Sequence, residues 1–360
     1  MPDVLLFGAT GYTGTLTAHA LARRGTRFAI AGRNRTKLNA LAADTDPDDV
    51  RVVEVGDVHG LARACDDVAA LITCVGPFHQ LGSTAVEAAL RARVHYVDST
   101  GEIDFVGDLI TRRMDPARAA GIVMVPAAGF DEVPADVAVS LAVEGITRPR
   151  AVVTYQPPSK PSVGTIRSIL SGPARSSPSW IADGKPVVIR TGERSRWAPM
   201  PPPLGPKYSL SFPFAIGRIA PLHLELESFE TYAHMERAVA PLVKIGVPLG
   251  RAVLGLSPVQ KAIEFVLGNR TSGPDENARR RDTWTLLVEA RSEEKWRNVA
   301  LQGNDPYGLT AETLAAVALK LACDGHEEAG VMSPVQAAGL ETLQKELIDF
   351  GVDFQTWEGD

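Results

Sequence analysis

Cysteine is scarce in this 360-residue chain, which contains only Cys65, Cys74 and Cys323. A disulfide framework or a cysteine-based zinc site needs several cysteines at characteristic spacing, so the sequence argues against both. The seven histidines are scattered and show no metal-ligand spacing either. We therefore expect a protein without disulfides and without a bound metal.

The chain also lacks a block of basic residues. Its formal net charge is -6 and its isoelectric point is about 5.7. Proteins that bind nucleic acid usually concentrate lysine and arginine on one face or in one run. We therefore expect no nucleic-acid partner.

No hydrophobic run reads as a good membrane-spanning helix. The most apolar window of the second half, residues 238–256, is interrupted by Lys244 and Arg251 and broken by glycine and proline. It could line a site for an apolar substrate or touch a membrane surface, but a packed core or a dimer face is the interpretation we favour. Met1 stands almost directly before the first expected strand and leaves no room for a signal peptide. We therefore expect a cytoplasmic protein, with membrane association and a homodimer as open alternatives.

The chain begins with a glycine-rich turn between a short apolar strand and a helix. The strand is expected at residues 4–7 and the helix at residues 16–24. In such a turn the first glycine permits a tight bend, the second lets the backbone approach a pyrophosphate, and the third lets helix and strand pack closely. The free N–H groups and the dipole of the helix N-terminus then favour phosphate. The spacing G-x-x-G-x-x-G predicts a dinucleotide site formed by Gly8, Thr10, Gly11, Tyr12, Thr13 and Gly14.

Arginine follows the second expected strand, residues 28–31. An acidic residue there would bind the ribose hydroxyls of NAD, whereas arginine accommodates the additional phosphate of NADP. Arg33 is the first polar side chain after the strand, and Asn34 follows it. A guanidinium group suits phosphate because its planar fork can bond two oxygens. We therefore predict NADP as the cofactor, with a solvated basic loop as the alternative explanation.

Strands and helices alternate through the first 146 residues. Further strands are expected at residues 52–55, 68–75, 95–97 and 121–125. This alternation predicts an α/β fold with a Rossmann-type, doubly wound parallel sheet, whose ligands bind at the carboxyl edge. At that edge we expect cofactor contacts from Asp57, Val58, Cys74, Gly76, Pro77 and Phe78. Asp98, Glu102 and Asp131 are candidates for the active site there, although each could instead cap a helix or lie in a solvated loop.

The regular alternation of expected strands and helices ends near Gly145. We expect residues 1–146 to form the dinucleotide-binding domain and residues 147–309 to form a mixed α/β domain for substrate binding or dimerisation. Strands are expected at 150–156, 283–290 and 296–301, short strands and loops over 171–217, and an exposed hairpin tip over 268–282. Residues 310–360 should pack back on the first domain, with a helix capped by Thr310, another helix at 337–348 and a closing strand at 352–357.

Several of these stretches together resemble the saccharopine dehydrogenase-like family, in the branch that includes the trans-acting enoyl reductases. The resemblance rests on the opening glycines and on stretches near residues 31–34, 74–78, 95–102, 129–134, 307–311 and 330–334. In the middle of the chain it rests only on residues 163–165. It implies an NADP-linked oxidoreductase with a Rossmann domain and a mixed second domain.

The branch resemblance implies reduction of an enoyl group on a lipid or polyketide-like acyl substrate. Such a site must stabilise an enolate oxygen and supply a proton, and the weak candidates for this chemistry are Asp131, Tyr155 and Thr165. A carrier protein or a membrane surface could present the substrate.

Two alternative functions stay open. The first is C–N chemistry on an amino-acid conjugate, whose carboxylates would need cations such as Arg167, Arg175 or Arg218. The second is a non-catalytic NADP-binding protein that docks on lipid or a partner.

Overall fold

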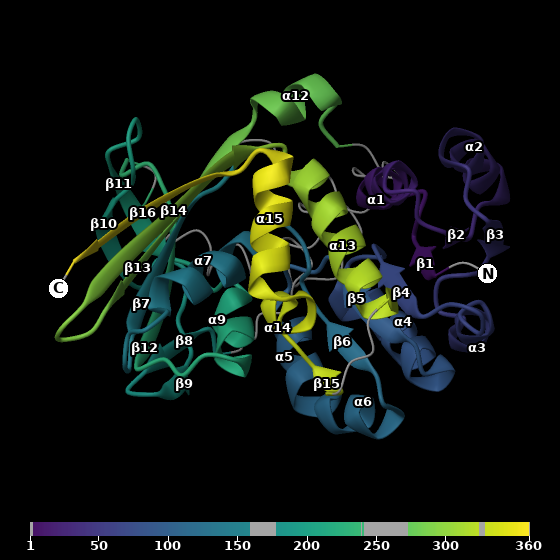
Figure 1. The fold of residues 1–360 in the computed structure, drawn as a ribbon, viewed down its shortest axis with the longest axis horizontal. Helices are drawn as coiled ribbons and strands as arrows, with labels where there is room; N and C mark the ends of the chain where they lie inside the picture. The colour runs from purple at the N-terminus through teal and green to yellow at the C-terminus, as the bar shows by residue number, and fades with distance from the viewer. Residues whose placement is uncertain (1–2, 159–177, 239, 241–272, 324–327, 360) are drawn as a thin grey trace, which may run out of the picture. The chain divides into compact units, whose positions relative to one another are not determined.

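The structure is a computed structural model, and it describes residues 3–158, 178–238, 240, 273–323 and 328–359 (Figure 1). These residues divide into two compact units. The first unit comprises Met1–Val133, Thr271–Gly273 and Tyr307–Glu346, and the second comprises Pro134–Arg270, Pro274–Pro306 and Leu347–Asp360. The C-terminal region is therefore divided between the units, and each unit is described by itself.

The first unit contains a seven-stranded parallel sheet in the order β15-β6-β5-β4-β1-β2-β3. The order reverses beside β1, since β2 pairs with one edge of β1 and β4 with the other. Ligands bind at such a switch point in doubly wound sheets. The strands are β1 (Val4–Phe7), β2 (Phe28–Gly32), β3 (Asp49–Val52), β4 (Ala70–Thr73), β5 (His95–Asp98), β6 (Val123–Val125) and β15 (Gly330–Val331).

Helices cover both faces of this sheet. Every residue of β1, β2 and β4 is buried, as expected when both faces of a parallel sheet are covered. This explains why these strands read as continuous apolar runs in the sequence. The helices are α1 (Tyr12–Arg23), α2 (Arg35–Thr45), α3 (Val58–Arg63), α4 (Phe78–Ala92), α5 (Ile103–Arg112), α6 (Met114–Ala120), α13 (Pro306–Cys323), α14 (Pro334–Ala338) and α15 (Leu340–Phe350), the last of which continues into the second unit.

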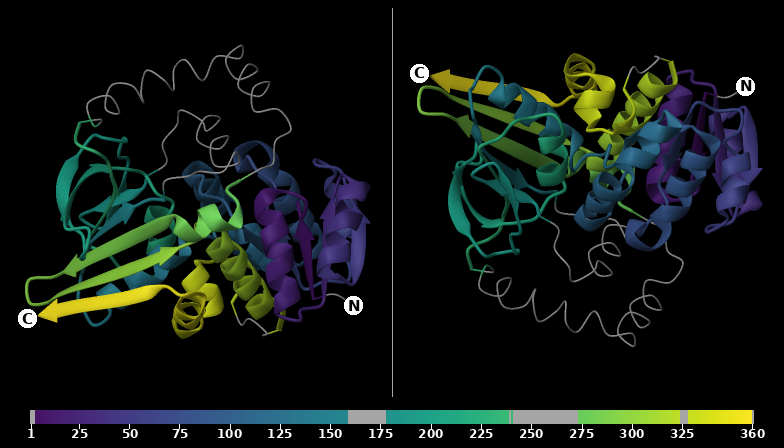
Figure 2. Two further views of the ribbon diagram at one scale, coloured as in Figure 1. Left: turned by 90° about the horizontal axis from the view of Figure 1, so that it is seen from above. Right: turned by 90° about the horizontal axis from the view of Figure 1, so that it is seen from below.

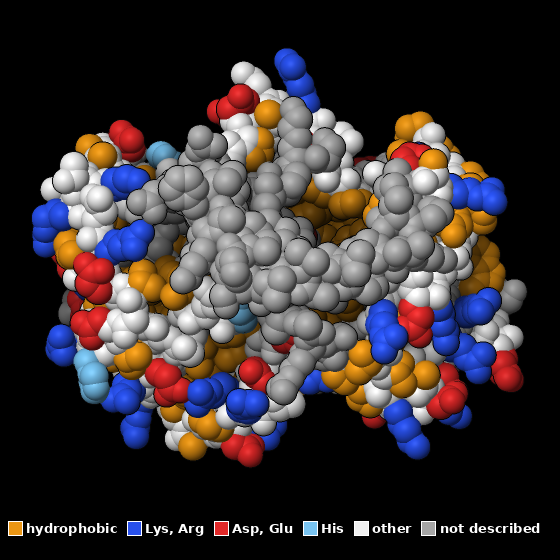
Figure 3. Space-filling model, turned by 180° about the vertical axis from the view of Figure 1, so that it is seen from behind, with side chains coloured by type: hydrophobic (Ala, Val, Ile, Leu, Met, Phe, Trp, Pro, Cys, Tyr) orange, Lys and Arg blue, Asp and Glu red, His pale blue; other side chains and the backbone are white. Residues whose placement is uncertain are grey.

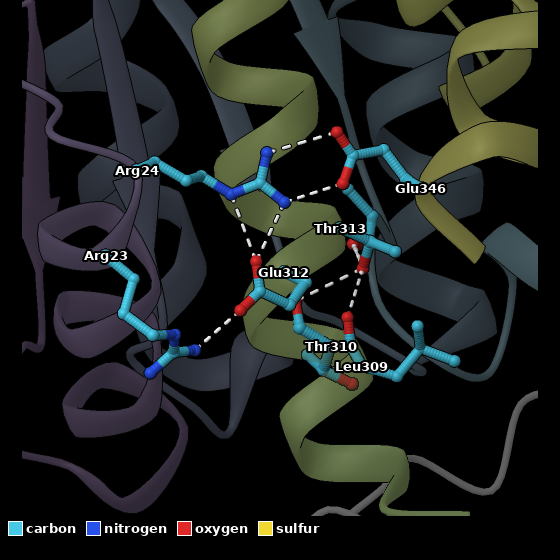
Figure 4. Close-up of polar contacts among 8 residues, drawn as sticks. Arg23, Arg24, Leu309, Thr310, Glu312, Thr313 and Glu346 are labelled. Carbon is cyan, nitrogen blue, oxygen red and sulfur yellow. Dashed lines mark hydrogen bonds and ion pairs between the residues drawn. The ribbon is translucent and has the colours of Figure 1, made fainter. Parts of the chain in front are cut away.

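Helix α13 is fixed to α1 by an ion-pair network (Figure 4). Arg23, the last residue of α1, and Arg24, its C-cap residue, both bind Glu312 of α13, at 2.6 and 2.8 Å. Arg24 also binds Glu346 of α15 at 2.6 Å. The hydroxyl of Thr313 donates to the carbonyl of Ala128 at 2.8 Å. Helices from the end of the chain are thereby joined to the helix that follows the glycine-rich turn.

The second unit contains a nine-stranded mixed sheet whose main order is β10-β11-β12-β7-β13-β14-β16, with β8 and β9 attached beside β12. Only β12 and β7 pair in parallel along the main order of these strands. Strands β13, β14 and β16 lie side by side in both views of Figure 2. The strands are β7 (Arg150–Gln156), β8 (Trp180–Ala182), β9 (Lys185–Val187), β10 (Ser195–Pro199), β11 (Pro206–Ser211), β12 (Ser228–His234), β13 (Thr283–Arg291), β14 (Trp296–Asn304) and β16 (Asp353–Gly359).

Short helices complete the second unit: α7 (Val133–Val143), α9 (Ile216–Ile219), the 3-10 helix η1 (Ala220–Leu222) and α12 (Glu276–Arg281). Arg297 of β14 donates to the carbonyls of Leu141 and Glu144, both at 2.9 Å, and so fixes the end of α7.

On the face drawn in Figure 3, basic and acidic side chains are interspersed over the described residues. Among these residues, no helix combines the length and hydrophobicity that a membrane crossing requires.

Several details of the sequence prediction were wrong. Strand β3 covers Asp49–Val52 rather than 52–55, because this edge strand is partly exposed and needs no apolar run. The charged stretch before Asp282 forms helix α12 instead of a hairpin tip, since the Asp275 carboxylate caps it by accepting from Ala278 N at 2.8 Å. Thr310 does not cap α13, which begins at Pro306; its hydroxyl accepts from Phe130 N at 3.0 Å. The window 238–256 lies almost wholly outside the described residues.

Candidate functional site

The glycine-rich turn between β1 and α1 has no room for side chains at two of its positions. Gly8 has φ +81°, and a Cβ added there would lie 2.7 Å from Cγ2 of Val75. A Cβ at Gly14 would lie 2.2 Å from the carbonyl oxygen of Gly8. Gly11 is the N-cap residue of α1, and no side chain caps the helix. The backbone of this turn therefore carries no side chains at its glycines and is closely packed, so that a phosphate can approach it.

Helix α1 presents its first N–H groups at this turn. Thr15 N donates to Gly11 O at 2.8 Å and is the first donor of the helical hydrogen-bond series. The N–H groups of Thr13 and Gly14 precede it and have no acceptor within the helix. Together with the helix dipole they favour an anion. The turn therefore fits the pyrophosphate of a dinucleotide, and cofactor contacts from Thr10, Tyr12 and Thr13 stay a prediction.

The loops after β2 and β3 position the residues expected near the adenosine half of the cofactor. Arg33 is exposed and makes no ion pair with the residues that the structure describes. Asn34 caps α2 by accepting from Lys37 N at 3.0 Å, and Asp57 caps α3 by accepting from Gly60 N at 2.8 Å. Val58 opens α3. The guanidinium of Arg33 is thus available for a phosphate, whereas Asn34 and Asp57 also hold their helices.

The turn after β4 lies beside the glycine-rich turn, since Val75 approaches Gly8. Cys74, Gly76, Pro77 and Phe78 follow one another here, and Phe78 begins α4. Burial raises the pKa of the Cys74 thiol to about 12. The thiol is therefore protonated at neutral pH, so Cys74 does not act as a nucleophile.

Asp98 connects the loops that follow β5 and β6. Its Oδ1 accepts from the backbone N–H groups of Thr100 and Ala127, both at 2.8 Å, and its Oδ2 accepts from the Tyr96 hydroxyl at 2.7 Å. Burial raises the pKa of Asp98 to about 6, although these hydrogen bonds pull it in the opposite direction. The buried Asp98 side chain thus holds the loops after β5 and β6 together at the carboxyl edge of the sheet.

The raised pKa of Asp98 predicts a pH-dependent stability. A carboxyl whose pKa is about 3.9 in the unfolded chain and about 6 when folded favours the folded state at low pH, and this contribution is lost as pH rises through 6. Asp98→Asn cannot ionise and can keep the same geometry. We expect the free energy of unfolding of the wild type, relative to Asp98→Asn, to fall by about 2 kcal/mol between pH 4.5 and 8. Urea unfolding at both pH values measures this, and parallel behaviour of the two proteins would contradict it.

Glu102 holds the beginning of α4 from the neighbouring strand end. Its carboxylate accepts from the backbone N–H groups of Phe78 and His79, both at 2.9 Å, and its Oε2 lies 2.7 Å from Nδ1 of His79. Glu102 N in turn donates to the Thr100 hydroxyl at 3.0 Å. A histidine–carboxylate pair therefore lies at the carboxyl edge of the parallel sheet. The sequence indicated Glu102 but not His79, whose only signal was its position directly after Phe78.

The three catalytic candidates fall in different parts of the chain. Asp131 is exposed. It lies near Gly101, since a Cβ added at Gly101 would be 3.2 Å from Asp131 Oδ2. Desolvation by the surrounding protein raises the pKa of Asp131 to about 6. Tyr155 belongs to the second unit, where its ring stacks on Phe214 with centroids 4.0 Å apart. Thr165 lies outside the described residues. Of these, only Asp131 belongs to the first unit.

Comparison with known proteins finds a family match within the first unit. The family model of the saccharopine dehydrogenase NADP binding domain matches residues 4–125. A protein named trans-acting enoyl reductase from Mycobacterium leprae is 34% identical over 140 residues, which are 37% of this chain and 34% of that protein. Its namesake from Mycobacterium ulcerans is 34% identical over 143 residues, with the same shares. The chain therefore spans about a third of the length of these curated relatives.

The fold comparison covers the whole chain. Apo saccharopine dehydrogenase (L-Glu forming) from Saccharomyces cerevisiae matches 100% of both chains with a TM-score of 0.62 and 13% identity, a likeness of fold. The matched family domain includes the glycine-rich turn and Arg33, whose geometry fits the cofactor. The family match supports NADP as the cofactor of residues 4–125, and the chain shares the fold of saccharopine dehydrogenase.

Proposed function

We propose that this protein is an NADPH-dependent reductase of an enoyl group on a lipid or polyketide-like acyl substrate. The observation that supports it most is the 34% identity of about a third of the chain to proteins named trans-acting enoyl reductase. When bound, NADPH supplies the hydride for such a reduction. The chain's own residues must then hold the cofactor phosphates, exclude water and deliver a proton.

The residues of the first unit suit these tasks. The bare turn of Gly8, Gly11 and Gly14 and the start of α1 accept the pyrophosphate, and Arg33 offers a cation to the additional phosphate. His79 and Glu102 form an acid–base pair at the same sheet edge. Cys74 stays protonated, so covalent attack by a thiolate is not part of the proposal.

A second candidate function is C–N oxidoreduction on an amino-acid conjugate, and Arg218 favours it. This arginine lies in α9 of the second unit and is half-buried. Its Nε is buried and meets no hydrogen-bond acceptor among the residues that the structure describes. Desolvation lowers the pKa of its guanidinium. A cation so placed would gain from a carboxylate ligand. The other two arginines considered for this role, Arg167 and Arg175, lie outside the described residues.

The test is a fluorescence titration with NADPH, followed by absorbance at the NADPH band with a panel of enoyl thioesters of increasing chain length. We expect tight binding and thioester-dependent oxidation. Oxidation that depends on an oxo acid together with an amino acid would instead select C–N chemistry. Binding without turnover in both panels would leave the protein as a non-catalytic NADP-binding module. Arg33→Asp is the matched control, because it should weaken NADPH binding without changing the preference for acyl chain length.

A further inference from the structure

His79 is held by Glu102 in a way that leaves one ring nitrogen available. Nδ1 of His79 lies 2.7 Å from Glu102 Oε2, and no acceptor or donor among the described residues meets Nε2. The side chain is only 17% exposed, so it is largely buried but still reaches solvent. A carboxylate acceptor fixes Nδ1 as the protonated nitrogen and sets the orientation of the ring.

Glu102, which holds His79, is itself fixed at its carboxylate and at its backbone. Two backbone N–H groups of the first turn of α4 bind the carboxylate, and the N–H of Glu102 binds the Thr100 hydroxyl. Thr100 N binds Asp98, which is buried at the end of β5. An unbroken series of hydrogen bonds therefore runs from the core of the sheet to the imidazole. Such support holds an acid–base group in one orientation.

The pair also lies at the position where chemistry is expected. His79 stands in the first turn of α4, directly after β4, and β4 is the strand beside β1 across the switch point. Polar groups beyond the carboxyl ends of these strands face the ligand in doubly wound sheets. The glycine-rich turn lies at the same edge, since Gly8 approaches Val75.

Other protic groups at this edge are poorer acids for the task. The thiol of Cys74 has a pKa of about 12 and Tyr96, whose pKa is also raised, already donates its hydroxyl proton to Asp98. Asp131 is exposed, whereas the His79 side chain is largely enclosed and is held by a carboxylate. A histidine paired with a carboxylate commonly serves as a general acid and base.

We infer that His79 is the general acid of the proposed enoyl reduction and that Glu102 is its positioning residue. The inference rests on the proposed function. Bound NADPH would supply the hydride for the new C–H bond at the β-carbon, and the electrons of the C=C bond would move to the enolate. Nε2 of His79 then gives its proton to the α-carbon, which leaves a saturated thioester and a neutral imidazole. Solvent returns the proton to His79, so one NADPH and one proton are consumed for each double bond.

The first test needs no substrate. In protein labelled with 15N-histidine, the His79 ring signals are assigned from their loss in His79→Gln. We expect NADP+ to shift the Nε2 signal, whereas 2′,5′-ADP, which lacks the nicotinamide, leaves it in place. Equal responses to both ligands, or no response to either, would place His79 away from the reacting half of the cofactor and overturn the inference.

The second test uses turnover of an enoyl thioester. His79→Gln should lower kcat about 100-fold or more, as expected for loss of a general acid, with the Kd for NADPH within about twofold of wild type. Glu102→Gln should lower kcat with little change in KM and should shift the His79 ring signals. His19→Gln is the matched control: the same replacement on α1, away from the strand ends, should leave kcat unchanged.

The two proposals fail in different ways. If the wild type reduces enoyl thioesters and His79→Gln is equally fast, the proposed function stands and the inference falls. If no thioester is reduced, the proposed function fails, and the protonation step fails with it even where NADP+ shifts the His79 signal.

Discussion

Replacing Gly14 by alanine is expected to abolish measurable NADPH binding and to destabilise the protein. The added Cβ would lie 2.2 Å from Gly8 O and 2.9 Å from Ala9 Cα, and both are backbone atoms that cannot rotate away. To relieve the clash, α1 must move away from β1 or the turn must shift. Overpacking of this kind costs about 3 kcal/mol. A shift of the phosphate cradle should weaken NADPH binding at least ~100-fold, which corresponds to about 2.8 kcal/mol.

Urea unfolding of the apo protein and fluorescence titration with NADPH measure the two effects separately. Gly32→Ala is the matched control for stability, because its added Cβ would meet nothing closer than 3.8 Å. We expect it to change the free energy of unfolding by less than about 1 kcal/mol. If Gly14→Ala binds NADPH as tightly as wild type, the close packing of helix on turn is not what shapes the cradle.

The sequence predicted the parts of the fold that depend on local pattern. Strands β1, β2 and β4 are buried on both faces, so their residues had to be apolar and the runs were easy to find. Strand β3 was misplaced because an edge strand tolerates exposed residues such as Asp49. Helix α12 was missed because a charged run is compatible with either a loop or a capped helix, and the Asp275 cap decides between them.

The sequence could place single residues at the candidate site, but it could not show which of their side chains contact one another. The glycines of the first turn and the polar residues after β5 could be located because the strands put them at one edge. The contact between His79 and Glu102 joins residues on two different strand–helix connections, and no local pattern shows it. The same holds for Thr310, whose hydroxyl accepts from Phe130 N in a distant part of the chain. Such contacts depend on how the strands are ordered, which spacing along the chain does not reveal.

The network around Arg24 should also have a large effect on stability. Arg24 bonds Glu312 and Glu346 at the same time, and its side chain is only 24% exposed (Figure 4). Burial alone would lower the pKa of Arg24, but the hydrogen bonds to the two carboxylates raise it above its usual value. Burial would raise the pKa of Glu312, yet its bonds to Arg23 and Arg24 hold it low. Arg24→Met leaves two partly buried carboxylates close together, one of them without a cation.

We expect Arg24→Met to lower the free energy of unfolding by about 3 kcal/mol, since removing one partner of a buried ion pair costs more than the pair contributes. Arg23→Met is the matched control: Arg23 is 63% exposed, and Glu312 keeps Arg24, so the loss should stay below about 1 kcal/mol. Urea unfolding of both variants decides the matter. Equal losses would mean that α13 is held to α1 by packing rather than by this network. A large loss for Arg24→Met alone would show that an ion-pair network fixes the C-terminal helices to the helix that begins at the phosphate cradle.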